Sequence, residues 1–158
     1  MKISIGLSEE AVTVSMQALK QYLADSLVLY VKTQGCHWNV VSSDFGPLHE
    51  LFQKQYEDLA DANDETAERM RSLGQWAPST IPAILESKTL SDFDSSEQPD
   101  MVMVQALLSD HESMCQFLRT AIPSVQSGGD EVTADYFIER LTVHEKTAWF
   151  LRSTLAKG

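Results

Sequence analysis

One face of a helical stretch in the first half of the chain carries histidine and carboxylate side chains. Read at steps of three and four residues, this stripe consists of His49, Gln53, Glu57, Ala60, Asp64 and Glu68. Residues at these steps share one face of an α-helix, so Asp64 and Glu68 can contact the same cation. Imidazole and carboxylate together suit Fe(II), with Zn(II), Co(II) and Mn(II) as competitors. The stripe predicts a metal site, although a solvated acidic face would show the same spacing.

The distance along the helix decides how such a site could be assembled. His49 and Asp64 are fifteen residues apart, which is roughly 22 Å at ~1.5 Å per residue, so one straight helix cannot bring both to one ion. Two copies lying antiparallel across a two-fold axis could do so, because His49 of one chain would then face Asp64 and Glu68 of the other. The pattern predicts two identical sites per dimer, with the helices crossing around residues 56–59.

His37 extends this site. It continues the helical phase of a stripe formed by Leu23, Leu27, Tyr30 and Gln34. We therefore expect His37 just beyond the end of the first helix, with its ring pointing inward towards the start of the second. The alternative is a hydrogen-bonded core histidine with no metal. The predicted ligands, two from each chain, are His37, His49, Asp64 and Glu68.

The sequence argues against metal ions held inside the bundle of a single chain. Intrachain di-iron sites use Glu-x-x-His pairs, and none of the four histidines has a glutamate three positions before it. His111, Glu112 and Cys115 share one helical face and could form a further metal site, with surface or packing roles as the alternative. We interpret His144 and Glu145 as structural.

Four long helical stretches are expected to position these residues, over 8–34, 47–73, 100–121 and 130–156. Capping and helix-breaking residues mark their ends, namely Ser8, Asp44 or Gly46, Pro47, Gly74 and Pro123. The connection over 75–99 is interrupted by prolines and has room for a short helix over 82–87. This pattern predicts an all-α, ferritin-like four-helix bundle, with a short extra helix in the long central connection, as a single domain over residues 1–158.

Composition bounds the class of protein. The 158 residues carry a formal net charge of −11 and two cysteines. An acidic surface attracts cations and repels phosphate backbones, so direct nucleic-acid binding is disfavoured. No apolar run approaches the ~20 residues that cross a bilayer, and Met1 to Gly6 lack the apolar core of a secretion signal. We expect a cytoplasmic protein with reduced cysteines and no membrane partner.

Two segments resemble the Dps-type mini-ferritins, the family of DNA-binding proteins from starved cells. The first contains His37-Trp38-Asn39-Val40, Asp44-Phe45, Leu48-His49-Glu50-Leu51-Phe52 and Asp64-Glu65-x-Ala67-Glu68-Arg69. The second contains Gly129-Asp130-Glu131-x-Thr133-x-Asp135 and His144-Glu145-Lys146-x-x-Trp149. The likeness covers essentially the whole chain, and the His-Trp-Asn and Asp-Glu-x-Ala-Glu-Arg blocks at this separation are specific.

The resemblance implies a ferroxidase that assembles as a hollow shell of twelve subunits. Fe(II) would be oxidised, preferably by hydrogen peroxide, at two-fold interfaces and stored inside as ferric mineral, which protects against oxidative damage. The implied iron ligands are His37, His49, Asp64 and Glu68. The family usually has a carboxylate where this chain has Gln53. An amide is a poorer ligand for a hard cation, so we predict a weaker second iron position there, held weakly or through water.

The resemblance also assigns roles to residues around the site. Trp38 would lie near the iron and take up stray oxidising equivalents, or it packs in the interface. Asp130, Asp135 and Glu139 would line three-fold pores that draw Fe(II) inward. The alternative for these three is the ordinary preference for acidic residues at a helix N-terminus.

DNA binding in the family often depends on a lysine-rich tail. Here Lys2 is the only lysine or arginine before Lys20, and the chain ends Leu155-Ala156-Lys157-Gly158. We therefore expect no tight DNA binding. The functional alternatives are a metal-sequestering cage with weak oxidase activity, for which Gln53 argues, a DNA-compacting architectural protein, and a helical interaction module.

Overall fold

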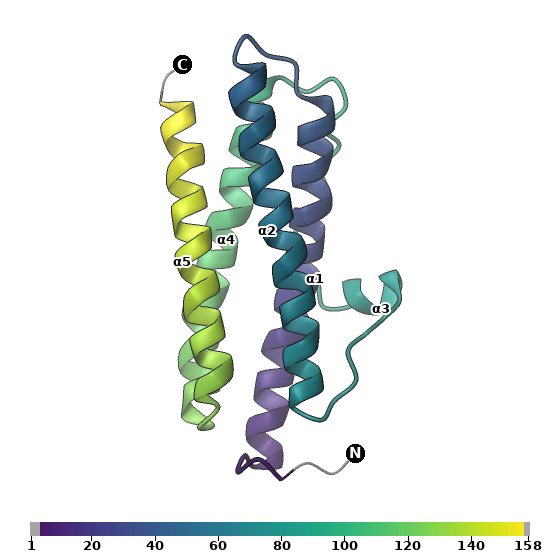
Figure 1. The fold of residues 1–158 in the computed structure, drawn as a ribbon, viewed down its shortest axis with the longest axis vertical. Helices are drawn as coiled ribbons and strands as arrows, with labels where there is room; N and C mark the ends of the chain where they lie inside the picture. The colour runs from purple at the N-terminus through teal and green to yellow at the C-terminus, as the bar shows by residue number, and fades with distance from the viewer. Residues whose placement is uncertain (1–3, 157–158) are drawn as a thin grey trace.

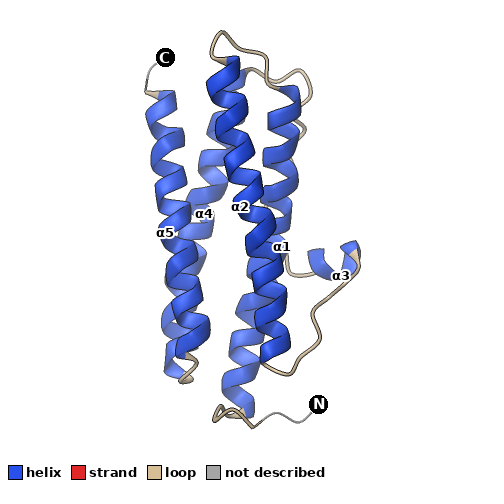
Figure 2. Ribbon diagram, viewed as in Figure 1, coloured by secondary structure: helices blue, strands red, loops and turns tan. Residues whose placement is uncertain are grey.

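A computed structural model describes residues 4–156, which form four long helices and one short helix (Figure 1). Lys2 and Lys157 lie outside the described residues. The elements are α1 (Glu9–Asn39), α2 (Phe45–Ser72), α3 (Ile81–Leu85), α4 (Asp100–Ser127) and α5 (Glu131–Leu155). Helices and loops account for the whole described chain (Figure 2), and α1 pairs mainly with α2 as α4 does with α5. The predicted all-α, ferritin-like bundle with a short helix in the central connection is confirmed.

The first helix is longer than its sequence pattern predicts. Ser8 caps its start, because the Ser8 hydroxyl accepts a hydrogen bond of 3.1 Å from the Ala11 N–H. Helical hydrogen bonding continues to the Val40 N–H, which donates to the Cys36 carbonyl. His37 therefore lies in the last turn of α1, and the expectation that it follows the helix was wrong.

The third long stretch also passes its expected end at residue 121, because Pro123 lies inside α4. A proline within a helix loses one backbone hydrogen bond and costs ~3 kcal/mol. Ala121 and Val125 on either side are buried in the core, so packing of this turn offsets the cost. The helix instead ends at Gly128, where a Cβ atom would lie 3.0 Å from Ala11 Cβ of α1.

The long connection is fixed to α1 by a buried carboxylate. Asp25, which is 1% exposed, accepts hydrogen bonds from both the backbone and the side chain of Thr89 and from the Leu90 N–H. Further along, the Asn39 side chain donates to the Ser95 hydroxyl at 2.9 Å. These bonds hold the connection against the helix that carries His37.

Among the helices of residues 4–156, we find none long and apolar enough to span a bilayer.

Candidate metal centre

His37 and His49 are brought together where α1 ends and α2 begins. Their rings are stacked, with centroids 3.6 Å apart and planes 20° from parallel. Each ring is bonded to the backbone of the other residue: His37 Nδ1 lies 2.8 Å from the His49 carbonyl oxygen, and His49 Nδ1 lies 2.9 Å from that of His37. The sequence-predicted convergence of these two side chains is therefore observed.

These two hydrogen bonds fix the tautomer of both imidazoles. A carbonyl oxygen can only accept, so Nδ1 must carry the hydrogen in each ring. In the neutral form, Nε2 is then left with its lone pair free on both residues. A histidine ligand whose other nitrogen donates to a carbonyl is the usual arrangement at metal sites in proteins. The pair thus presents two oriented nitrogen donors.

Aromatic rings flank the pair. Phe45 stacks on His49, with centroids 4.9 Å apart and planes 27° from parallel, and Tyr56 meets His37 edge-on at 5.2 Å. His37 is 9% exposed, whereas the neighbouring Trp38 is 68% exposed. The inward orientation predicted for His37 is therefore confirmed, and Trp38 points away from the core.

The two predicted carboxylate ligands lie further along α2. Asp64 and Glu68 are exposed, and within residues 4–156 neither belongs to an ion pair. They share a continuous helix with His49, so the separation of roughly 22 Å stands. In the described part of one chain, no three histidine, cysteine, aspartate or glutamate side chains converge on a common point. A single chain therefore brings the histidines together but not the carboxylates.

Gln53 lies between these groups on the same stripe. Its side-chain nitrogen donates a hydrogen bond of 2.7 Å to a carboxylate oxygen of Glu57. Because the amide nitrogen is engaged, the amide oxygen is the atom left to face a cation. This oxygen carries no formal charge, so it supplies less electrostatic attraction than the carboxylate typical of this position would.

Asp130 does not have the environment predicted for a pore residue. It is 2% exposed, and its carboxylate accepts hydrogen bonds from Ser15 at 2.7 Å, from Thr133, and from Arg69 at 2.7 Å. Burial acts to raise its pKa, but the hydrogen bonds from Thr133 and Ser15 and the Arg69 charge outweigh burial and lower it. Asp130 caps α5 and joins it to α1 and α2. Asp135 and Glu139 are exposed on α5 and remain predictions for a pore.

A second histidine pair, His111 and His144, lies inside the bundle, and the sequence pattern does not predict that these two residues meet. His111 Nδ1 and His144 Nδ1 are 2.8 Å apart, and His144 Nε2 lies 3.1 Å from the Tyr22 hydroxyl. The Tyr22 oxygen also accepts a hydrogen bond of 2.9 Å from Arg140, which forms an ion pair with Asp58. This buried polar network joins α1, α2, α4 and α5. Sequence spacing within one helix could not reveal it, because its members come from four helices.

The electrostatics of this network keep both imidazoles neutral. Burial and the Arg140 charge lower the pKa of His111 to about 3. Burial, the neighbouring His111 and Arg140 also lower the pKa of His144 well below its usual value. The suggested site of His111, Glu112 and Cys115 is not formed, because His111 is buried in the core while Glu112 is half-buried and pairs with Arg152. The structural interpretation of His144 is supported.

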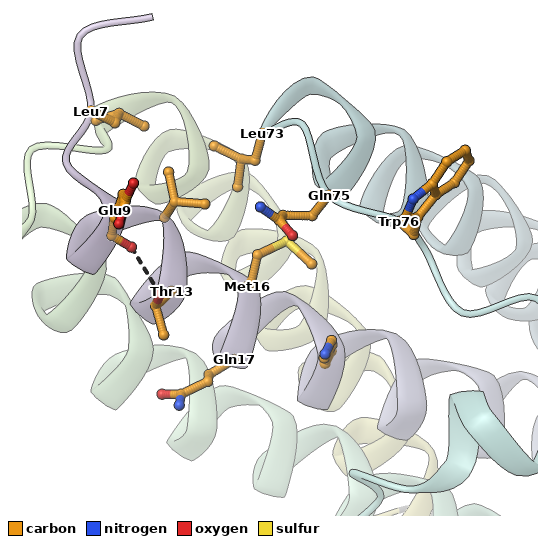
Figure 3. A pocket seen from close by; sticks show the side chains of 10 residues that line it. Leu7, Glu9, Thr13, Met16, Gln17, Leu73, Gln75 and Trp76 are labelled. Atoms are coloured by element: carbon orange, nitrogen blue, oxygen red, sulfur yellow. Dashed lines mark hydrogen bonds between the residues drawn. The ribbon is translucent and has the colours of Figure 1, made fainter. Parts of the chain in front are cut away.

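A groove of ≈ 690 Å³ lies at the other end of the α1–α2 pair (Figure 3). Leu7, Met16, Leu73 and Trp76 supply much of its apolar lining, and the Thr13 hydroxyl beside them donates to the Glu9 carbonyl. No histidine or cysteine lines this groove. It therefore lacks imidazole and thiolate donors, and the candidate centre remains at the His37–His49 end.

Comparisons with known proteins agree with this fold. Residues 16–158 match the model of the ferritin-like domain. The chain is 37% identical over 156 residues to a low temperature-induced protein of Nostoc, covering 96% of this chain and 86% of that protein. It is 33% identical over 140 residues to DNA protection during starvation protein 2 of Bacillus anthracis, covering 89% and 95%. A Dps protein from Vibrio cholerae, described as a ferritin-like diiron-carboxylate protein, superimposes with a TM-score of 0.90 at 26% identity, covering 98% of this chain and 96% of that one.

Proposed function

Since this chain belongs to the ferritin-like family, and within it to the Dps-type mini-ferritins, we propose that it is a ferroxidase that oxidises Fe(II) and stores the ferric product inside a shell of its own copies. Iron storage and protection against oxidative damage are the general role of the family. The observation that carries the proposal for this chain is the His37–His49 pair, whose Nε2 atoms are both left free by hydrogen bonds to backbone carbonyls.

The proposed centre forms between two chains. His37 and His49 of one protomer would meet Asp64 and Glu68 of its partner across a two-fold axis, because a symmetric contact places the same stripe of both α2 helices face to face. The absence of counter-ions for Asp64 and Glu68 within the described residues supports this arrangement. We further propose that twelve subunits enclose the storage cavity, with Asp135 and Glu139 at the entry pores.

The ligand set favours oxidation of the bound metal. Two carboxylates place negative charge beside the ion, which stabilises Fe(III) more than Fe(II), while neutral imidazoles suit either state. With hydrogen peroxide as the preferred oxidant, two Fe(II) ions each give one electron: two Fe(II), one peroxide and two waters yield two FeOOH and four protons. The two proposed metal positions would hold both Fe(II) ions, and so both electrons, close to one peroxide. The protein would hold the two ions together, and its carboxylates would supply the negative charge that favours Fe(III).

The first experiment measures Fe(II) oxidation by stopped-flow absorbance, with peroxide and with dioxygen in separate runs. We expect rapid oxidation that is faster with peroxide. Asp64→Asn should lower the initial rate by about 100-fold or more, because loss of an outer contact to a metal ligand alone removes up to about 100-fold. Glu50→Gln is the matched control, because Glu50 is an exposed carboxylate of the same helix that pairs with Lys54. Metal binding without turnover would instead support a sequestering cage.

A complementation experiment tests whether the site is shared. His49→Ala chains and Asp64→Asn chains are each expected to be inactive. In a mixed dimer, one of the two sites would combine the intact His49 of one chain with the intact Asp64 of the other. Random assembly of equal amounts should therefore restore about a quarter of the wild-type sites. A site built within one chain would restore none, because every chain carries a defect.

DNA compaction is the weaker second function. The names of several relatives refer to DNA protection, but the net charge of −11 opposes binding to phosphates. We propose protection through iron chemistry, without tight DNA contact, in the cytoplasm, where the thiols of Cys36 and Cys115 stay free. A mobility shift at physiological salt with nanomolar affinity would contradict this part of the proposal.

A further inference from the structure

His49 is the less constrained of the two histidines in the centre. It is only half-buried, and within residues 4–156 its ring makes one hydrogen bond, to the His37 carbonyl. A single hydrogen bond fixes where Nδ1 lies but leaves the ring plane free to rotate about that bond. The direction of the Nε2 lone pair depends on that plane, so another contact must hold it.

Two flat contacts hold the ring plane. His37 stacks on His49 at 3.6 Å and 20°, and Phe45 stacks on it at 4.9 Å and 27°. Two rings that are both nearly parallel to His49 cannot occupy the same face, so they cover opposite faces. His37 is itself fixed by burial and by the edge of Tyr56. Among the aromatic contacts of the described residues, Phe45 is therefore the only ring that packs on the outer face of His49.

Phe45 has no comparable role in the core. It is the first residue of α2 and is 47% exposed, so much of its apolar surface stays in water. It does not belong to the group of residues that form or pack on the hydrophobic core. Its stacking on His49 is the contact that explains its position.

Resting on the proposed function, we infer that Phe45 is a positioning residue of the metal centre, which holds the plane of His49 and directs its Nε2 at the second metal position. This position is the one where Gln53 stands in place of a carboxylate. With a neutral oxygen beside it, His49 becomes the strongest ligand that the same chain offers there. The second position thus depends on the orientation of His49 more than the first does.

The test is anaerobic titration of the full-length assembled protein with Co(II), followed by calorimetry and by the visible ligand-field spectrum. The wild-type protein should show a tighter and a weaker class of bound Co(II). Phe45→Leu should weaken the weaker class at least tenfold, the lower end of the effect of losing an outer contact to a metal ligand. The tighter class should change less than about twofold, and the spectrum of the weaker class should alter, which a purely structural role would not cause. Phe45→Tyr, which keeps the stacking ring, should bind both classes of Co(II) as the wild type does.

Val41→Ala is the matched control, because Val41 is an apolar residue in the connection just before α2 and is 86% exposed. The inference is overturned if Phe45→Leu binds Co(II) as the wild type does, if both classes weaken equally, or if Val41→Ala has the same effect. A wild-type protein that takes up no Co(II) would overturn the proposed centre itself and this inference with it. The two failures are distinguished by the wild-type titration alone.

Discussion

The two histidine pairs of this protein have similar short contacts but opposite chemistry. In the His37–His49 pair, backbone carbonyls accept the Nδ1 hydrogens, and both Nε2 atoms are left free. In the His111–His144 pair, the nitrogens bond to each other and to Tyr22, and only Nε2 of His111 has no partner among the described residues. The first pair presents free nitrogen lone pairs where α1 ends and α2 begins. The second pair belongs to a hydrogen-bonded network that links α1, α2, α4 and α5.

This difference shows that the surroundings of a histidine decide its role more than its proximity to another histidine does. A metal ligand needs one satisfied nitrogen and one open nitrogen with acidic groups nearby. A structural histidine needs burial among other side chains and a neutral state, which burial and Arg140 enforce by lowering the pKa of His111. Substitutions at the first pair should therefore change metal binding, and those around the second should change stability.

Among single substitutions, the largest effect on stability that separates the two regions is expected from Asp58→Asn. This change leaves the Arg140 guanidinium, whose side chain is 5% exposed, without its carboxylate partner. Breaking a fully buried ion pair costs ~3–5 kcal/mol, and the 39% exposure of the Asp58 side chain reduces this to about 2 kcal/mol. Urea unfolding at fixed protein concentration measures the loss, with Asp61→Asn, an exposed carboxylate of the same helix, as the control.

The same measurement on the first pair should give the reverse result. His49→Ala removes a half-buried ring, so the free energy of unfolding without metal should change by no more than about 0.5–1 kcal/mol, while the weaker class of bound Co(II) is lost. Equal destabilisation by Asp58→Asn and His49→Ala would remove the distinction between the two regions.

The second effect is loss of stability in acid. The folded-state pKa of His111 and of His144 lies below the ordinary value, so the unfolded chain binds more protons as the pH falls below about 6.5. Stability should then decrease with falling pH, by up to ~1.4 kcal/mol per pH unit for each histidine, down towards pH 3 for His111. The double substitution His111→Leu with His144→Leu should flatten this dependence. Identical slopes for both proteins between pH 6.5 and 4.5 would contradict the assignment.

The sequence predicts the fold closely because the four helices carry strong periodic patterns and clear ends. Gly74, with φ +75°, follows the end of α2 as expected. The errors occur where tertiary contacts outweigh local signals. Pro123 lies inside α4 because the residues on either side of it are buried. The Asp130 carboxylate accepts hydrogen bonds from residues of α1, α2 and α5, so it is not free to line a pore in the described chain.

The candidate site was predictable only in part. The stripe on α2 and the inward phase of His37 indicate which residues share a face. The reciprocal bonds to backbone carbonyls and the stacking of Phe45 depend on how the α1 end meets the α2 start. The spacing of residues within one helix cannot predict how the end of α1 contacts the start of α2. It also cannot predict the buried network that joins Tyr22 to His144.

The smallest effect concerns the one residue of the stripe that departs from the usual ligand set. Gln53→Asp would place a charged oxygen beside the Nε2 of His49, so the weaker class of Co(II) should tighten about tenfold, which equals ~1.4 kcal/mol. The bond from Gln53 to Glu57 would be lost, and the added negative charge would lie near Glu57 when metal is absent. Stability without metal should therefore fall slightly, while stability with metal rises.

Gln53→Glu, whose longer side chain reaches further, serves as the comparison. If both acidic variants bind Co(II) and oxidise Fe(II) as the wild type does, then Gln53 does not border a metal position, and the centre consists of one ion held by His37 and the carboxylates of the partner.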